Sequence, residues 1–108
     1  MLPRAFFSVS VNSFLIHHSY NGHGGNVVED CAWHGLHANL FGSVGDDRRI
    51  AIWDFRNAPK KGPVHSVLEA HEKEVNCISF SPFNEFLFCT GSADASVALW
   101  DIRNLKCR

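Results

Sequence analysis

Histidine and cysteine are the residues of this 108-residue chain best suited to metal binding or nucleophilic chemistry, and they number seven and four. Their closest groupings are the His17-His18 pair and the His-x-x-His spacing of His34 and His37. A structural zinc site needs four ligands, and neither grouping includes a cysteine. A nucleophilic cysteine needs surroundings that lower its pKa, and the sequence has no P-loop, Gly-x-Ser-x-Gly or His-Glu-x-x-His motif. The sequence therefore predicts neither an enzyme nor a bound cofactor or metal.

A second set of polar side chains is repeated at an interval of 47 residues. The segments 28–57 and 75–104 are identical at nine of thirty aligned positions. Five of the identical pairs are Asp47/Asp94, Trp53/Trp100, Asp54/Asp101, Arg56/Arg103 and Asn57/Asn104. Periods of 20 to 50 residues are typical of stacked or radial arrays. These side chains are therefore expected to serve the architecture of a repeated unit.

Each repeated unit has the pattern of short β-strands. Runs rich in branched and aromatic residues are bounded by Gly, Pro and Asn, and no segment has helical periodicity free of such breakers. The expected strands lie within 27–34, 40–44, 49–55 and 64–71 in the first unit and within 74–81, 86–91 and 96–102 in the second. The third strand of each unit is almost entirely apolar, as expected of a strand buried on both faces. The fold class is therefore all-β.

Composition narrows the classes of partner. Ten basic and eleven acidic residues give no strong field of one sign, so a surface that follows nucleic-acid phosphates is not expected. No apolar stretch approaches the length of a membrane span. The four cysteines form no Cys-x-x-Cys pair, and Cys31, Cys77 and Cys89 lie in strand-like runs. Buried free thiols in a reducing compartment are therefore favoured over disulfides.

Residues 1–21 stand apart from the repeat. One arginine followed by an apolar stretch resembles a signal peptide, and the serines and lack of acids resemble a transit peptide, but no small-residue cleavage site follows. The favoured interpretation is an outer strand that belongs to a preceding unit.

A histidine near the start of each unit, an aspartate in a turn and a closing Trp-Asp resemble the WD-repeat signature. The resemblance implies β-propeller blades, each a four-stranded antiparallel sheet. It also implies two structural hydrogen-bonded sets: His23, Ser43, Asp47 and Trp53 in one blade, and His71, Thr90, Asp94 and Trp100 in the next. Because propellers typically have four to eight blades, the chain is expected to form an incomplete propeller, with one blade at 22–69 and a second at 70–108 that lacks its outer strand.

The chain resembles two central blades of the retinoblastoma-binding, MSI-type histone-binding proteins in four sequence segments, VVEDCAWH, LFGSVGDD, EVNCISFSPFNEF and GSADASVALWD. That resemblance covers about residues 22 to 106. It implies a nuclear, non-catalytic scaffold subunit of complexes that assemble and modify chromatin, with histone tails and other subunits as partners. It also implies that Glu29, Asp46 and Asn76 line the rim that binds basic N-terminal peptides.

The residues themselves support part of this expectation. Glu29 and Asn76 occupy equivalent positions in the two repeats, and Asp46 precedes the turn residue Asp47, so all three should lie near one rim. Carboxylate and amide oxygens suit the heads of lysine and arginine. A solvated polar rim without a ligand is the alternative.

Two further functions stay open at this point. Trp-Asp-x-Arg resembles the motif by which some propellers dock on the adaptor of cullin-RING ubiquitin ligases, with Arg56 and Arg103 as the contacts. Alternatively, the chain is a truncated product without independent function.

Overall fold

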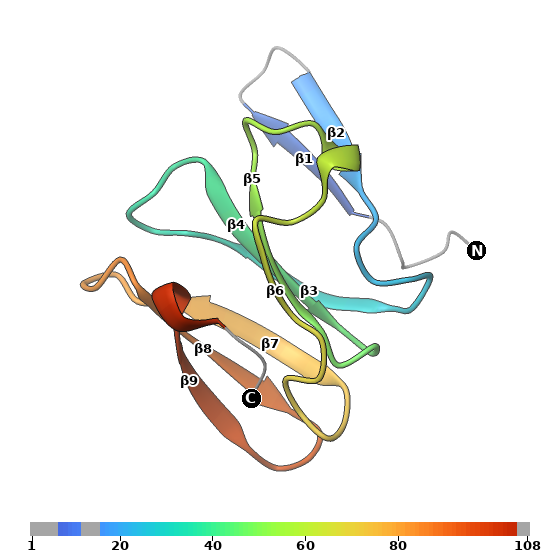
Figure 1. Cartoon of the computed structure of the whole chain (residues 1–108), viewed down its shortest axis with the longest axis vertical. Coiled ribbons are helices and arrows are strands. Elements are labelled where there is room, and N and C mark those ends of the chain that lie inside the picture. Colours follow the sequence, from blue (N-terminus) through green and yellow to red (C-terminus); the bar gives the residue numbers. More distant parts are fainter. Residues whose placement is uncertain (1–6, 12–15, 106–108) are drawn as a thin grey trace.

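The computed structural model describes residues 7–11 and 16–105 of the chain. Nine strands and two short 3-10 turns follow one another along this part (Figure 1). In order they are β1 (Phe7–Val11), β2 (Ile16–Tyr20), β3 (Val28–Trp33), β4 (Leu40–Gly45), β5 (Ile50–Asp54), η2 (Pro59–Lys61), β6 (His65–Val67), β7 (Val75–Phe80), β8 (Leu87–Ser92), β9 (Val97–Asp101) and η3 (Ile102–Asn104). None of the helical segments in the described part has the length and apolarity of a membrane span.

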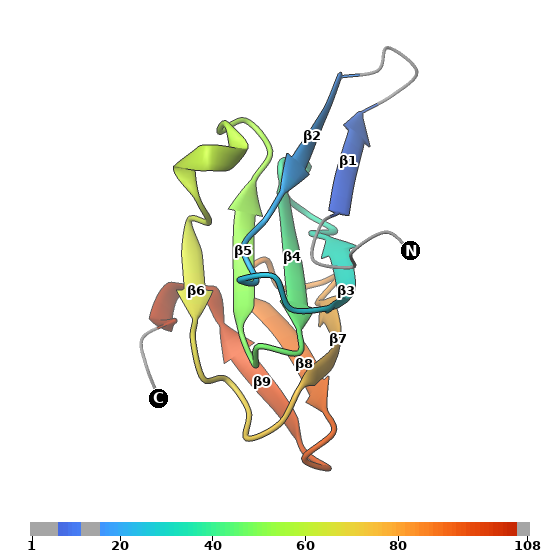
Figure 2. The same ribbon diagram turned by 90° about the vertical axis from the view of Figure 1, so that its right-hand side faces the viewer.

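The strands form three antiparallel sheets. The first blade has the order β3-β4-β5-β6, the second has β7-β8-β9, and β1 and β2 pair as a hairpin. Figure 2 shows the hairpin at one end of the first blade, while the second blade lies behind it. The prediction of an all-β, incomplete propeller is therefore confirmed. Where the sequence suggested one outer strand before residue 22, the structure has the two strands of this hairpin.

The strands of the two blades form where the sequence pattern places them. In β5 the four residues Ile50–Trp53 are all buried, as the continuous apolar run predicts. In β3 half-buried and exposed residues alternate, as in a strand with one face on the core. The main core lies between the two blades, where Val44, Ile50 and Ile52 meet Val75 and Ile78.

A second, smaller core joins the hairpin to the outer face of the first blade. Tyr20, at the end of β2, is 1% exposed and packs edge-on against Phe41 and Trp53, with ring centroids 5.0 Å away from each. The hairpin is therefore attached to the blade through aromatic contacts.

Two predictions about burial are wrong. The run 96–102 was expected to be buried on both faces, but Val97 is 80% and Leu99 71% exposed, because none of the sheets in the described part of the chain covers this face. Cys31 and Cys77 are free but exposed, and Cys89 is free and half-buried. Each of the three lies on a blade face that points away from the core between the blades. Cys107 lies outside the described residues.

Candidate functional site

A chain of hydrogen bonds crosses the first blade. His23, in the loop before β3, has Nδ1 2.9 Å from Asp47 Oδ1 and Nε2 2.8 Å from Ser43 Oγ. Because a carboxylate only accepts, Nδ1 carries the proton and the serine hydroxyl donates to Nε2. Trp53 Nε1 donates to the same Ser43 Oγ at 2.9 Å. The four residues therefore connect the entry loop, β4, the β4–β5 turn and β5.

The second blade repeats this arrangement with one difference. His71 Nε2 lies 2.7 Å from Thr90 Oγ1, which accepts from Trp100 Nε1 at 2.9 Å. His71 Nδ1 lies 3.0 Å from Ser96 Oγ and 3.3 Å from Asp94 Oδ2. The structure thus brings together all eight residues assigned to these sets, and Ser96 is a further member that the sequence analysis missed.

The turn that holds each aspartate has an unusual backbone conformation in both blades. Arg48 and Ala95, which follow the two aspartates, have φ values of 67° and 69°. Such values are uncommon for residues other than glycine. Asp47 Oδ1 accepts from the Arg49 backbone N–H, and Asp94 Oδ1 accepts from that of Ser96. Each carboxylate therefore fixes its own turn as well as its histidine.

Two carboxylates of the second blade, those of Asp94 and Asp101, should make the fold less stable in acid. Hydrogen bonding from the Ser96 hydroxyl holds the pKa of Asp94 well below its usual range, and hydrogen bonding from the Arg103 side chain lowers the pKa of Asp101. Groups whose pKa is lower in the folded than in the unfolded state stabilise the fold fully above the unfolded value, about 3.9. We expect the free energy of unfolding to fall as the pH drops below about 4. Denaturant titrations at several pH values measure this slope.

The matched variants for this prediction are Asp94→Asn and Ser96→Ala. The first removes the titrating group, and the second removes the largest cause of its lowered pKa. Both should flatten the dependence on pH in acid. An unchanged slope in Asp94→Asn would contradict the assignment.

Glu29 and Asn76, two of the three residues predicted to bind peptide, lie at β-bulges. The register of β3 with β4 shifts between Val28 and Asp30, so Glu29 is the extra residue. The register of β7 with β8 shifts between Val75 and Cys77, so Asn76 is its equivalent. Bulges redirect side chains and are frequent beside functional sites. Both residues are exposed.

Asp46 lies at the same end of the first blade. Its backbone N–H donates to Val27 O at 2.8 Å, which joins the end of β4 to the start of β3. In Figure 2 the β4–β5 turn lies at the lower end of the first blade, and the β6–β7 connection and the β8–β9 turn lie below it. One carboxylate oxygen of Asp46 is buried and accepts no hydrogen bond from the described residues. Glu29, Asp46 and Asn76 thus lie toward one rim, which we call the bulge rim.

Arg56 and Arg103 are tied to the aspartates of their own Trp-Asp pairs. Arg56 Nε and Nη2 donate to the two oxygens of Asp54 at 3.0 and 2.6 Å, and Arg103 binds Asp101 in the same way at 3.0 and 2.7 Å. Hydrogen bonding from Arg56 lowers the pKa of Asp54. These paired hydrogen bonds to Asp54 and Asp101 account for the positions of both arginine side chains. The geometry of the arginines therefore gives no separate argument for an adaptor-binding motif.

The two histidines considered as metal ligands join the blades instead. His34 Nε2 donates to Glu85 O at 2.8 Å, while its Nδ1 accepts from the backbone N–H groups of Leu36 and His37. His37 Nε2 lies 3.0 Å from Glu85 Oε1. Among the described residues no three His, Cys, Asp or Glu side chains are placed to hold a metal ion. The side chains of His17 and His18 lie outside that description.

Asp30 makes a further contact between the blades that the sequence analysis missed. Its Oδ2 accepts from the backbone N–H of Ile78 at 3.0 Å. The contact caps part of the unpaired edge of β7. Its only signal in the sequence was its place as the second of two adjacent acids in a strand rich in apolar residues.

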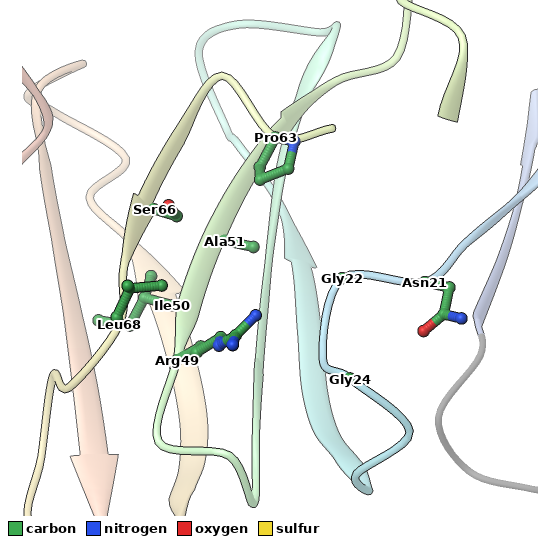
Figure 3. A pocket seen from close by; sticks show the side chains of 9 residues that line it. All are labelled: Asn21, Gly22, Gly24, Arg49, Ile50, Ala51, Pro63, Ser66 and Leu68. Carbon is green, nitrogen blue, oxygen red and sulfur yellow. The ribbon is translucent and has the colours of Figure 1, made fainter. Parts of the chain in front are cut away.

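A pocket of about 440 Å³ lies between the loop after β2 and the strands β5 and β6 (Figure 3). Ala51, Pro63 and Leu68 supply apolar surface, and Arg49 points toward the loop. Of the described residues that line it, Arg49 alone carries a charge. A cation there does not suit a basic peptide, and no bulge-rim residue lines this pocket.

Comparison with known families agrees with the repeat. A family model described as "WD domain, G-beta repeat" matches residues 14–54 and 62–101, more than half of the chain. The first match contains β2 and the first three strands of the first blade, and the second contains β6 and the three strands of the second blade. Each matched unit is therefore one strand followed by three strands of the next sheet, so β2 corresponds to β6.

Proposed function

The chain belongs to the WD-repeat family, and from this premise we propose that it is a non-catalytic scaffold that binds basic N-terminal peptide segments at the bulge rim. WD-repeat domains mediate protein–protein interactions, and the chain carries two such repeats. The observation that supports this choice of ligand is the repeated bulge, which brings the acidic Glu29 and the amide of Asn76 to the same end of neighbouring blades.

The charges near the bulge rim favour a cationic ligand. Asp46 lies beside the first bulge, and its buried oxygen has capacity for a hydrogen-bond donor. Glu72 and Glu74 lie in the loop that leads to the second bulge. Ammonium and guanidinium groups form charge-assisted hydrogen bonds with carboxylates, which are about twice as strong as neutral ones.

The source of the peptide is proposed from the resemblance to the MSI-type histone-binding proteins. The sequence segments on which this resemblance rests include VVEDCAWH and EVNCISFS, which contain Glu29 and Asn76. We propose that the ligand is a histone tail, that the partners are subunits of chromatin assembly and modification complexes, and that the chain acts in the nucleus.

The test is binding of a labelled, Lys- and Arg-rich histone-tail peptide, measured by fluorescence anisotropy. We expect the substitution of both Glu29→Lys and Asp46→Lys to weaken binding by roughly 100-fold, because bonds to charged groups contribute about 1.5–3 kcal/mol each. Thermal melts of the same samples establish whether the variant stays folded.

The control is Glu85→Lys, which reverses one charge at the other end of the second blade, where Glu85 contacts His37. This variant should bind the peptide as the original chain does. Equal loss from Glu29→Lys alone and Glu85→Lys would indicate a general charge effect and contradict the rim site. A folded chain that binds no peptide would favour the alternative of a truncated product without independent function.

A further inference from the structure

The pocket between the loop after β2 and the strands β5 and β6 lies on the side of the hairpin that faces β6 (Figure 3). Because β2 corresponds to β6, the outermost strand of its blade, further strands would extend the hairpin's sheet from β1. Figure 2 shows β1 on the side of β2 away from β6. The turn η2, which leads into β6, lies against β2. The walls of the pocket are therefore elements that the structure describes, and extension of the sheet at β1 would leave the pocket open.

The repeat shows that the fold does not require an arginine at position 49. Asp47 accepts a hydrogen bond from the backbone N–H of Arg49. In the second blade Asp94 accepts the same bond from Ser96, so the backbone fixes the turn whichever side chain is present. Arg49 Nε lies 3.5 Å from Asp47 Oδ2, which is longer than a usual hydrogen bond. The side chain is 43% exposed and points toward the loop after β2 in Figure 3, so the end of the guanidinium can donate to a ligand.

The charges around the pocket favour an anionic ligand. Lys60 and Lys61 are exposed in η2, the turn that leads into β6. Glu69, the acid that follows β6, pairs with Arg48 at 3.5 Å. The aspartate of the β4–β5 turn also accepts from a histidine, so it offsets the charge of Arg49 only in part. A carboxylate in the pocket would therefore meet a positive surface.

The rest of the pocket is apolar and open. Ala51, Pro63 and Leu68 all line it, and Leu68 is 52% exposed. An apolar side chain of a ligand would remove this leucine from water, which is favourable. In the described part of the chain β6 is the outermost strand of its sheet, so its outer backbone groups are available to an extended peptide. The pocket thus combines a cation, an apolar wall and a strand edge.

We propose that this pocket binds an acidic peptide segment of a partner protein. A carboxylate of the segment pairs with Arg49, and an apolar side chain beside it packs on Leu68. A guanidinium can donate two parallel hydrogen bonds to one carboxylate. The volume of about 440 Å³ lies within the range of about 300–1,000 Å³ that is usual for ligand sites. This site is separate from the bulge rim, and the two sites prefer ligands of opposite charge.

The test is binding of a short, fluorescently labelled peptide rich in glutamate and leucine, measured by fluorescence anisotropy. We expect Arg49→Gln to weaken binding roughly 10- to 100-fold, because it removes a hydrogen-bonded charge pair. Leu68→Ser should weaken binding roughly three- to tenfold through the loss of apolar contact. A second peptide, with glutamine in place of glutamate, should bind the original chain more weakly than the first peptide does. Arg49→Gln should not distinguish the two peptides.

The matched control is Arg48→Gln. Arg48 adjoins Arg49 in the sequence and is equally exposed, at 44% against 43%. It pairs with Glu69 and is not among the described residues that line the pocket. This variant should bind the peptide within about twofold of the original chain, as expected for the loss of an exposed ion pair. Equal weakening by Arg48→Gln and Arg49→Gln would indicate a general charge effect and overturn the proposal.

Two other results would also overturn the proposal. One is equal binding of the glutamate and glutamine peptides to the original chain, since no carboxylate would then be recognised. The other is tighter binding of hexanoate than of the glutamate peptide, which would indicate a pocket for small carboxylates. Circular dichroism melts verify that each variant is folded. If Arg49→Gln does not fold, the comparison of the two peptides on the original chain and on Leu68→Ser decides the question.

Discussion

Trp53→Ala is expected to lower the melting temperature by roughly 12–40 °C or to abolish the cooperative transition. Loss of a buried tryptophan costs about 3–5 kcal/mol, and in a domain of this size each kcal/mol shifts the midpoint by about 4–8 °C. Trp53 is 2% exposed, stacks with Phe41 at a centroid distance of 6.2 Å and contacts Tyr20. Its removal opens the core that attaches the hairpin. Thermal melts followed by circular dichroism measure the effect.

Trp53→Phe separates the volume of the ring from its hydrogen bond. The phenyl ring retains most of the aromatic contacts but cannot donate to Ser43 Oγ, which is buried. We expect a smaller loss, about 1–3 kcal/mol, the cost of a buried polar group deprived of a partner. A melting temperature for Trp53→Ala within a few degrees of the original would show that the indole is not part of the core.

The repeat of 47 residues predicted the strands because their pattern is local. Branched and aromatic runs bounded by breakers specify β3 to β9, and the repeated Trp-Asp specifies the third strand of each blade. The two bulges could not be seen in this way. Both repeats insert the extra residue at the same place, Glu29 and Asn76, so the offset stays constant through it.

Features that depend on contact between elements were not predicted. The hairpin pairs β2 with β1, a strand that has no counterpart in the repeat, and its attachment depends on the placement of Tyr20. The exposure of Cys31 and Cys77 depends on which blade face is covered, and hydrophobicity along the chain does not reveal this. The bond between Asp30 and Ile78 joins residues 48 positions apart, which no local pattern specifies.

Gly42→Val is expected to weaken the packing of the two blades and to cost about 1–3 kcal/mol of stability, the usual effect of added volume in a packed core. The new side chain would collide with Ile78 and Phe80 from the second blade and lie 3.3 Å from Ile52 Cδ1. The second blade is attached to the first mainly through β7, so its amide protons should exchange faster with solvent. Denaturant unfolding and hydrogen exchange at Ile78 measure the two effects.

The repeat supplies a matched control for this substitution. Cys89→Val adds a branched side chain at the equivalent strand position, which no sheet of the described residues faces. We expect a change within about 0.5 kcal/mol, as for ordinary surface positions. Equal losses from Gly42→Val and Cys89→Val would mean that valine disturbs the strand itself. A loss of stability from Gly42→Val alone would show that the same strand position tolerates valine in the second blade but not in the first. The reason would be that a neighbouring sheet covers this position in the first blade only.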